Sequence, residues 1–162
     1  MLAENGKIYG IPATATSVLV IDPAKNTADV SKQVSSGAYK WWGGVLANGK
    51  IYGFPSGAPS VLVIDPTVDV VDETSIPVPV GDYKWAGGVL AGDGKIYCMP
   101  SSASTVLIID PNNNAVDITK ITGLTGGFKW WGGVLGDDGK VYGIPSYASS
   151  VIVLERSCTW TL

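Results

Sequence analysis

The sequence repeats itself with a period of about 44 residues. The motif Gly-Lys-(Ile/Val)-Tyr begins at residues 6, 49, 94 and 139, so successive copies are 43, 45 and 45 residues apart. Each copy is followed by a loop of small residues and then by four aliphatic residues, such as the run 18–21. A period of this length predicts copies of one supersecondary unit, each burying its apolar surface against its neighbours.

Each repeat divides into four expected β-strands. The turn at Asn48-Gly49 suits a tight hairpin because Asn and Gly accept positive φ at low cost. Pro55 and the pair Asp65-Pro66 mark strand ends, since proline cannot donate to a β-ladder. In the second repeat the predicted strands cover residues 41–47, 50–54, 61–64 and 70–78, and the fourth strand recurs at 27–34 and 115–121.

The third strand of each repeat is apolar at successive positions, so both of its faces must be buried. That pattern favours blades packed between blades over a sandwich with one wet face, and over a parallel β-helix, whose repeats are usually shorter. The expected fold is therefore all-β, a β-propeller arc of about four four-stranded blades. It forms a single domain over residues 1–162, with repeats at approximately 1–40, 41–84, 85–129 and 130–162.

Two stretches resemble the first three strands of a kelch repeat. These are Gly-Gly-Val-Leu-Ala-Asn-Gly-Lys-Ile-Tyr, within 43–53, and Ser-Val-Leu-Val-Ile-Asp-Pro, within 17–27. The chain departs from the kelch pattern after the second strand, where a Gly-Gly pair is replaced by Gly-Ile-Pro, Gly-Phe-Pro or Cys-Met-Pro. The resemblance implies a propeller and a binding or interaction role. The copper chemistry of kelch-like oxidases, which needs histidine ligands, is not implied.

Charge and composition exclude several partners. The formal net charge is -3 and Lys and Arg form no run, so neither nucleic acid nor an anionic membrane surface is an expected partner. The first residues lack the basic and apolar regions of a signal peptide, which favours a cytoplasmic location.

Catalytic and metal-binding signals are sparse. The chain contains no His, which removes the commonest general base and metal ligand. Cys98 and Cys158 do not have the spacing of a zinc site, and Asp22, Asp65 and Asp110 are best explained as caps of the turns that follow them. No metal or cofactor is therefore expected, and the chain is not expected to be an enzyme.

The block aromatic-Lys-Trp, at the start of each first strand, supplies the candidate site. Its recurring tryptophan, Trp41 in the second repeat, is expected to wedge between blades. Strand alternation predicts Lys40 and Trp42 on one face and Tyr39 and Trp41 on the other. Lysine and tryptophan at the mouth of a propeller could hold a carbohydrate or small anionic ligand through ring stacking and charge. The candidate ligand-binding residues are Lys40, Trp42, Lys84, Lys129 and Trp131. The alternative is that each lysine lays its stem on the ring and points its ammonium group into water.

The first repeat begins inside its first strand, so the first blade is expected to lack its innermost strand. About 15 strands result, where four complete blades would have 16. Exposed blade faces predict self-association, most simply a homodimer that closes one ring of seven or eight blades. The leading function is thus a non-enzymatic binding or interaction module. The alternatives are a purely structural fragment of a longer propeller and, remotely, a hydrolase or lyase.

Overall fold

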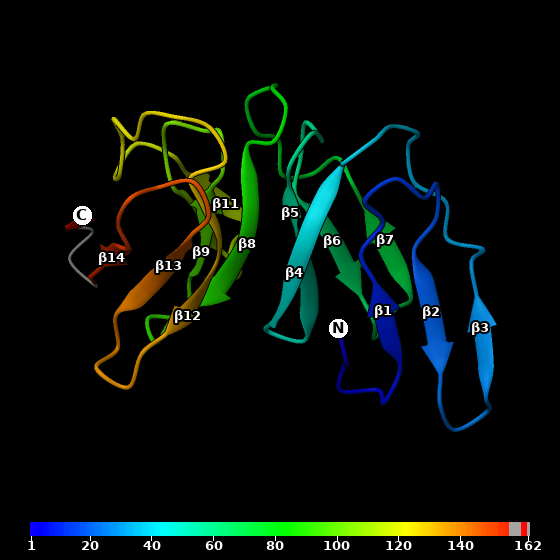
Figure 1. Ribbon diagram of the computed structural model, residues 1–162. Helices are drawn as coiled ribbons and strands as arrows, with labels where there is room; N and C mark the ends of the chain where they lie inside the picture. The colour runs from blue at the N-terminus through cyan, green and yellow to red at the C-terminus, as the bar shows by residue number, and fades with distance from the viewer. Residues whose placement is uncertain (156–159, 162) are drawn as a thin grey trace. The chain divides into compact units, whose positions relative to one another are not determined.

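The computed structural model describes residues 1–155 and, as backbone only, residues 160–161 (Figure 1). This part of the chain contains 15 β-strands and no helix, and so no helix that could cross a membrane. Contacts cluster in two compact units, Met1–Gly81 and Asp82–Leu162. Each unit holds two antiparallel sheets made from consecutive strands. The expected single domain over residues 1–162 stays a prediction.

The first unit contains a three-stranded sheet followed by a four-stranded sheet. The strands of the smaller sheet are β1 (Ile8–Gly10), β2 (Leu19–Asp22) and β3 (Thr27–Asp29). Those of the larger sheet are β4 (Trp41–Ala47), β5 (Lys50–Pro55), β6 (Leu62–Asp65) and β7 (Val70–Asp72). The predicted absence of the innermost strand from the first sheet is therefore confirmed.

The second unit contains two four-stranded sheets of the same design. The first comprises β8 (Trp85–Leu90), β9 (Ile96–Pro100), β10 (Leu107–Asp110) and β11 (Ala115–Asp117). The second comprises β12 (Trp130–Leu135), β13 (Val141–Pro145), β14 (Ile152–Leu154) and β15 (Trp160–Thr161). Cys158 lies outside the described residues.

The outermost strands β3, β7 and β11 begin where predicted but are shorter, because each ends in a capping aspartate. The carboxylates of Asp29, Asp72 and Asp117 accept the backbone N–H two residues further on, at 2.8, 2.7 and 2.7 Å. An aspartate that bonds its own backbone turns the chain out of the β-ladder. The chain then returns to the third strand, as the bond from the Val61 N–H to the Ile76 carbonyl at 3.0 Å shows.

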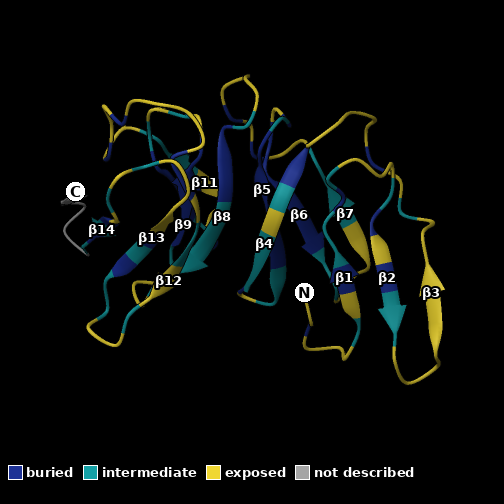
Figure 2. Cartoon of the chain, in the orientation of Figure 1, coloured by how far each residue is buried: buried dark blue, intermediate teal, exposed yellow. Residues whose placement is uncertain are grey.

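Within each unit the core lies between the two sheets. We call the side of a sheet that contacts the next sheet its following face, and the opposite side its preceding face. In the first unit the following face of β1–β3 packs against the preceding face of β4–β7, and the second unit repeats the arrangement (Figure 2). Val18 and Leu62 represent the two sides of the first core, and Val106 and Ile152 those of the second; all four are at most 1% exposed.

The recurring tryptophan fills the space between sheets, as predicted. Trp41 and Trp130 are 1% and 3% exposed and belong to the two cores. Each indole N–H donates to a backbone carbonyl beyond the second strand of its own sheet, Ser60 at 2.8 Å and Ser150 at 2.9 Å. The ring is thus held at both its apolar body and its polar edge.

Glycine at one position lets innermost strands approach closely. A Cβ on Gly87 in β8 would lie 2.5 Å from the Cα of Gly132 in β12, too close for any side chain. Gly87 also has a φ of +73°, which side chains rarely adopt. Gly87 and Gly132 therefore allow close backbone contact between β8 and β12.

Replacing Trp130 by Ala should lower the free energy of unfolding by about 3–5 kcal/mol, because a large buried ring and its hydrogen bond are both lost. The matched control is its chain neighbour Trp131, which is 43% exposed, so that Trp131→Ala should cost less than half as much. Urea denaturation followed by circular dichroism measures both. Equal losses would contradict the assignment of Trp130 to the core.

Candidate functional site

The lysine of each aromatic-Lys-Trp block is buried: Lys40, Lys84 and Lys129 are only 4%, 5% and 4% exposed. The ammonium of Lys129 donates to the carbonyls of Ser101 and Ala103, each at 2.9 Å, and of Gly126 at 2.8 Å. An ammonium has three N–H donors, so these carbonyls use all of them. The two serine-loop carbonyls come from the preceding sheet, and Lys129 therefore ties two sheets together at their loops.

Lys40 makes the same connection in the first unit. Its ammonium donates to the carbonyls of Ala15 at 2.8 Å and Gly37 at 3.3 Å. Its own carbonyl accepts the N–H groups of Ser56 at 2.9 Å and Ala58 at 3.0 Å, in the loop after β5. We call this arrangement the lysine clasp, defined by Lys40 and Lys129 with the carbonyls that they bind.

Burial also changes the acidity of these groups. It lowers the pKa of Lys40 and of Lys129, and it lowers the pKa of Lys84 to about 8, with Asp82 opposing the shift of Lys84. Each ammonium lies 5.7–6.0 Å from the centre of the following tryptophan ring. The ammonium itself thus lies over the ring, and in Lys40 and Lys129 it binds backbone carbonyls rather than pointing to water. Ligand binding through the lysines stays a prediction, and it would require an ammonium to leave those carbonyls.

The predicted alternation of Lys40 and Trp42 on one face is wrong. Tyr39 stacks on Trp42, with ring centres 6.0 Å apart, while Lys40 lies over Trp41. Two features break the alternation: Tyr39 has a φ of +52°, and the pairing of β4 with β5 shifts register between Trp41 and Gly44. Trp42 is half-buried, and its counterpart Trp131 in β12 is 43% exposed.

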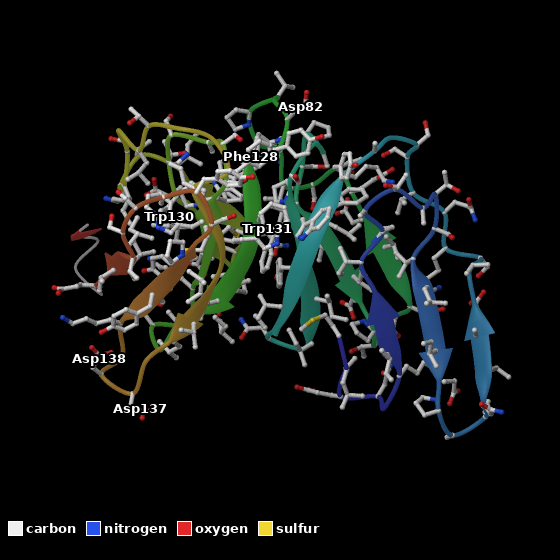
Figure 3. All side chains as sticks on the ribbon, in the orientation of Figure 1. Asp82, Phe128, Trp130, Trp131, Asp137 and Asp138 are labelled. Carbon is white, nitrogen blue, oxygen red and sulfur yellow. The ribbon has the colours of Figure 1, made fainter. Side chains whose placement is uncertain are left out.

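Three aromatic rings gather at the loop end of the second unit. The centre of the Phe128 ring lies 5.3 Å from that of Tyr83 and 6.2 Å from that of Tyr147. Phe128 and Tyr147 are 39% and 82% exposed. A backbone bond from the Tyr147 N–H to the Phe128 carbonyl, 3.1 Å long, fixes the two residues beside each other. Phe128 lies at the opposite end of the unit from Asp137 and Asp138 (Figure 3).

Phe128 is held in an unfavourable backbone conformation, with a φ of +52°, as are its counterparts Tyr39 and Tyr83 at +52° and +51°. A bulky residue in the left-handed region is uncommon and costs of order 1 kcal/mol. The bond from the Tyr147 N–H, and the corresponding bonds to the carbonyls of Tyr39 and Tyr83, show what holds the conformation. The chain thus displays an aromatic ring at a position where glycine would be less strained.

A pocket of about 260 Å³ opens beside Tyr147. Its walls are the loops before β12 and after β13. They offer the rings of Tyr147 and Trp130 together with several small polar groups. The lining residues are Thr125, Gly126, Gly127, Lys129, Trp130, Tyr147, Ala148, Ser149 and Ser150. Because Lys129 is engaged in its clasp, hydroxyl groups and rings are what this pocket presents to a ligand.

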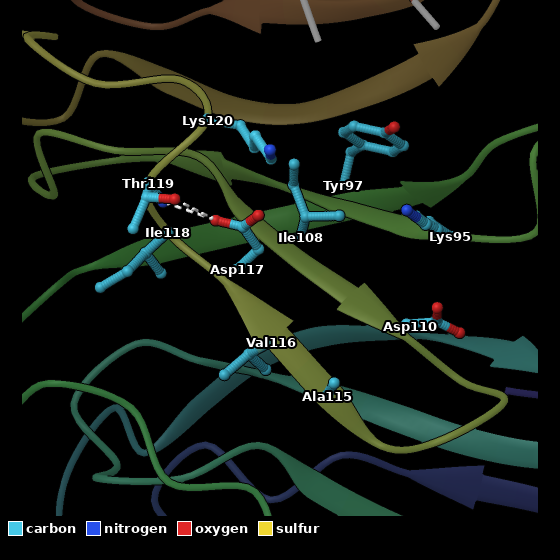
Figure 4. A pocket seen from close by; sticks show the side chains of 10 residues that line it. All are labelled: Lys95, Tyr97, Ile108, Asp110, Ala115, Val116, Asp117, Ile118, Thr119 and Lys120. Carbon is cyan, nitrogen blue, oxygen red and sulfur yellow. Dashed lines mark hydrogen bonds between the residues drawn. The ribbon is translucent and has the colours of Figure 1, made fainter. Parts of the chain in front are cut away.

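A larger hollow, of about 510 Å³, lies on the following face of the sheet β8–β11 (Figure 4). Lys95 and Lys120 border it together with Asp110 and Asp117, whose carboxylate is bonded to Thr119. In the first unit the counterpart of Lys120, Lys32, binds the carboxylate of Asp69 in the next sheet at 2.6 Å. The hollow is therefore the outer part of the seam between two sheets, and we do not favour it as the ligand site.

The aspartates behave as turn caps, as predicted. Asp22, Asp65 and Asp110 each accept a backbone N–H two residues ahead, at 3.0–3.1 Å. Within residues 1–155 no three His, Cys, Asp or Glu residues come close enough to hold a metal ion. Cys98 is a fully buried thiol, and burial raises its pKa.

Tyr83, Phe128 and Tyr147 are not among the candidate residues that the sequence pattern indicates. Tyr147 had a detectable signal, because it is the one aromatic residue in the four loops that follow the second strands, at 13–16, 56–59, 101–104 and 146–149. Phe128 and Tyr83 occupy an aromatic position shared by three repeats. Their pattern alone could not distinguish an exposed ring from a packed one.

Four antiparallel sheets of consecutive strands, without helices among the described residues, define an all-β protein of the propeller-like class. No family model matches the chain, and no curated protein matches its sequence. Solved structures do match its fold, and the kelch family is not shown among them.

Three of these structures show the range of proteins with this fold. Virginiamycin B lyase from Staphylococcus aureus has a TM-score of 0.80 at 14% identity, over 99% of this chain and 53% of the lyase. A second structure of that lyase, with quinupristin, is of a catalytically inactive histidine-to-alanine variant. Kuenenia stuttgartiensis hydrazine synthase scores 0.73 at 17% identity, over 99% and 46% of the two chains. An auxiliary nutrient binding protein from Bacteroides ovatus scores 0.68 at 14% identity, over 99% and 45%.

These likenesses show the fold, and they include enzymes as well as a binding protein. The chain spans about half the length of the lyases that it matches. The fold alone therefore leaves the activity open.

The titration of Lys84 should be visible in the stability of the protein. Between about pH 8 and 10.5 the folded chain has lost a proton that the unfolded chain still holds, because burial depresses the pKa of Lys84 in the folded state only. The free energy of unfolding should therefore rise with pH across this window by the contribution of this group. Urea denaturation at several pH values, compared between the parent and Lys84→Arg, measures it, because Arg does not titrate there. Parallel curves would contradict the burial of a titrating ammonium.

Proposed function

We propose that the chain is a non-enzymatic binding module that holds a neutral, sugar-like ligand at the loop end of its second unit. The observation that carries the proposal is the exposed ring pair Phe128 and Tyr147 beside the pocket of about 260 Å³. Aromatic rings with hydroxyl groups and backbone around them suit a ligand that is apolar on one face and polar at its rim. The strained backbone of Phe128 supports a binding role, since such strain gathers at functional sites.

The chemistry of the pocket favours a neutral ligand over an anion. A lysine that binds an anion needs a free N–H, whereas the three donors of Lys129 are taken by carbonyls. Thr125, Ser149 and Ser150 offer uncharged side chains in the same pocket. A nutrient-binding protein among the structures of the same fold supports a binding role for this class, but at 14% identity it identifies no ligand.

Two observations support a non-enzymatic role. The chain has no His, whereas the lyase structure described as catalytically inactive differs from its parent by one histidine. Around the pocket, the described residues offer Lys129 as the one titratable group besides the phenol of Tyr147, and Lys129 is bound to backbone. A hydrolase or lyase would need acid and base groups facing the same space.

A purely structural role is the second candidate. The clasp lysines Lys40 and Lys129 and the tryptophans Trp41 and Trp130 all serve packing or loop attachment. Phe128 and Tyr147 differ from them, because their rings are 39% and 82% exposed beside the pocket. A binding screen therefore separates the two candidates.

Binding should be tested first with neutral hexasaccharides, namely cellohexaose, chitohexaose and xylohexaose, with a hexagalacturonate as the anionic comparison. We expect at least one neutral probe to change tryptophan emission, because Trp130 lines the pocket. Tyr147→Ala and Phe128→Ala should each raise Kd about tenfold or more, the usual effect of removing a central ring from a contact.

The control is Tyr142→Phe in β13, whose hydroxyl binds Asp138 at the opposite end of the same unit and should leave Kd unchanged. No binding at millimolar probe, or binding that Tyr147→Ala does not weaken, would reject the proposed site. Preference for the hexagalacturonate would reject the neutral ligand class and would instead support an anionic ligand bound through the lysines.

A further inference from the structure

Two sheet faces of this chain are apolar and uncovered in the described structure. They are the preceding face of the first sheet, β1–β3, and the following face of the last sheet, β12–β15. The first exposes Leu2, Ile8 and Leu19, which are 63%, 37% and 39% accessible. The second exposes Val134, Ile144 and Val151, which are 52%, 47% and 40% accessible.

The same positions are covered wherever a neighbouring sheet is present. On the preceding face of β4–β7, Ile51 and Leu62 stand where the first sheet has Ile8 and Leu19, and both are fully buried. On the following face of β8–β11, Met99 and Val106 stand where the last sheet has Ile144 and Val151, and both are at most 1% exposed. Inside each unit, the following face of one sheet packs against the preceding face of the next. The two uncovered faces are one following face and one preceding face, so they could form the same kind of contact with each other.

The internal contacts show how these halves fit. In the contact inside each unit, the preceding face has a glycine in its second strand, and a side chain of the sheet before it lies over that glycine. At Gly53 this side chain is Ile11, 3.4 Å from the position of a Cβ, and at Gly143 it is Met99 at 2.8 Å. At Gly10, the counterpart in the first sheet, the three nearest atoms all belong to Leu19 of the same sheet. The place that Ile11 and Met99 occupy is open over Gly10.

We propose that a second copy of this chain covers these faces, with Ile144 of one copy lying over Gly10 and beside Leu19 of the other. Ile144 is the counterpart of Ile11 and Met99, so it brings to Gly10 the side chain that this position has in the internal contacts. The six exposed aliphatic side chains leave water when the two faces meet. Removing apolar surface from water is the dominant favourable contribution to such an association.

The contact joins unlike faces. Two copies that form it twice make a closed pair, whereas other geometries give a larger ring or an open series. A closed pair has twice the length of this chain. The lyases of the same fold are about twice as long as this chain, which favours closure at two copies. This inference does not depend on the proposed ligand site, because none of the six exposed residues lines the pocket beside Tyr147.

The test is the mass of the 162-residue chain in solution, measured by light scattering after size-exclusion chromatography. We expect twice the mass of one chain at about 10 µM, which corresponds to a dissociation constant below that concentration. Ile144→Asp and Leu19→Asp should each raise the dissociation constant at least tenfold and give the single-chain mass, because each buries a charge in an apolar contact.

Val80→Asp is the matched control, since Val80 is 85% exposed and lies on neither face. It should leave the double mass unchanged. Combining Ile144→Asp with Leu19→Lys places opposite charges side by side in both contacts and should restore the double mass. Circular dichroism confirms that each variant is folded; where an aspartate variant is not, Ile144→Ser and Leu19→Ser replace it.

A single-chain mass for the unaltered chain at about 10 µM overturns the proposal, since no apolar contact of useful strength would then exist. So does a double mass that neither face variant reduces, because the copies would then meet through another surface. Loss of sugar binding in Tyr147→Ala with an unchanged mass concerns the ligand site alone, and the two proposals can thus fail separately.

Discussion

A β-sheet that is apolar on both faces cannot stay in water without a cover, and this constraint governs the whole chain. Each repeat carries an unbroken aliphatic run in its third strand, so both faces of each sheet need an apolar cover. Val18 and Val106 on one side, with Leu62 and Ile152 on the other, show how completely water is excluded where a neighbour exists. The tryptophan wedges and the glycine contacts then adjust this packing to a close fit.

The loops depend on the same stacking through the lysine clasp. A buried ammonium is costly unless it is fully bonded, and the carbonyls that satisfy Lys40 and Lys129 come partly from the preceding sheet. The loop end of a sheet is therefore ordered by its neighbour as well as by its own strands. The ring pair Phe128 and Tyr147 stands on this framework, which explains how exposed aromatic side chains can keep a defined position on short loops.

Much of the fold could be predicted from the repeat, and much less of the site. The strands, their order and the shortened first sheet all follow from the spacing of Gly-Lys-(Ile/Val)-Tyr and the aliphatic runs. The candidate lysines were chosen because they recur beside tryptophan at the expected mouth of the propeller, where charge and ring stacking could hold a ligand. In the structure these lysines are buried, and Lys40 and Lys129 bind backbone carbonyls. The pattern of residue types cannot reveal such carbonyl partners. The positive φ of Tyr39 likewise made the predicted alternation of Lys40 and Trp42 wrong. Tyrosine rarely adopts a left-handed backbone, so its presence at this position gave no sign of one.

The contact between unlike faces has a consequence for how such chains change in size. Each sheet presents a surface that accepts the next sheet and a surface that the previous sheet accepts, so no repeat encodes a stopping point. A duplication or deletion of about 44 residues would add or remove one sheet and leave every remaining interface chemically intact. The number of sheets in proteins of this kind can therefore change by whole repeats, without any change in the residues that form the contact between neighbouring sheets.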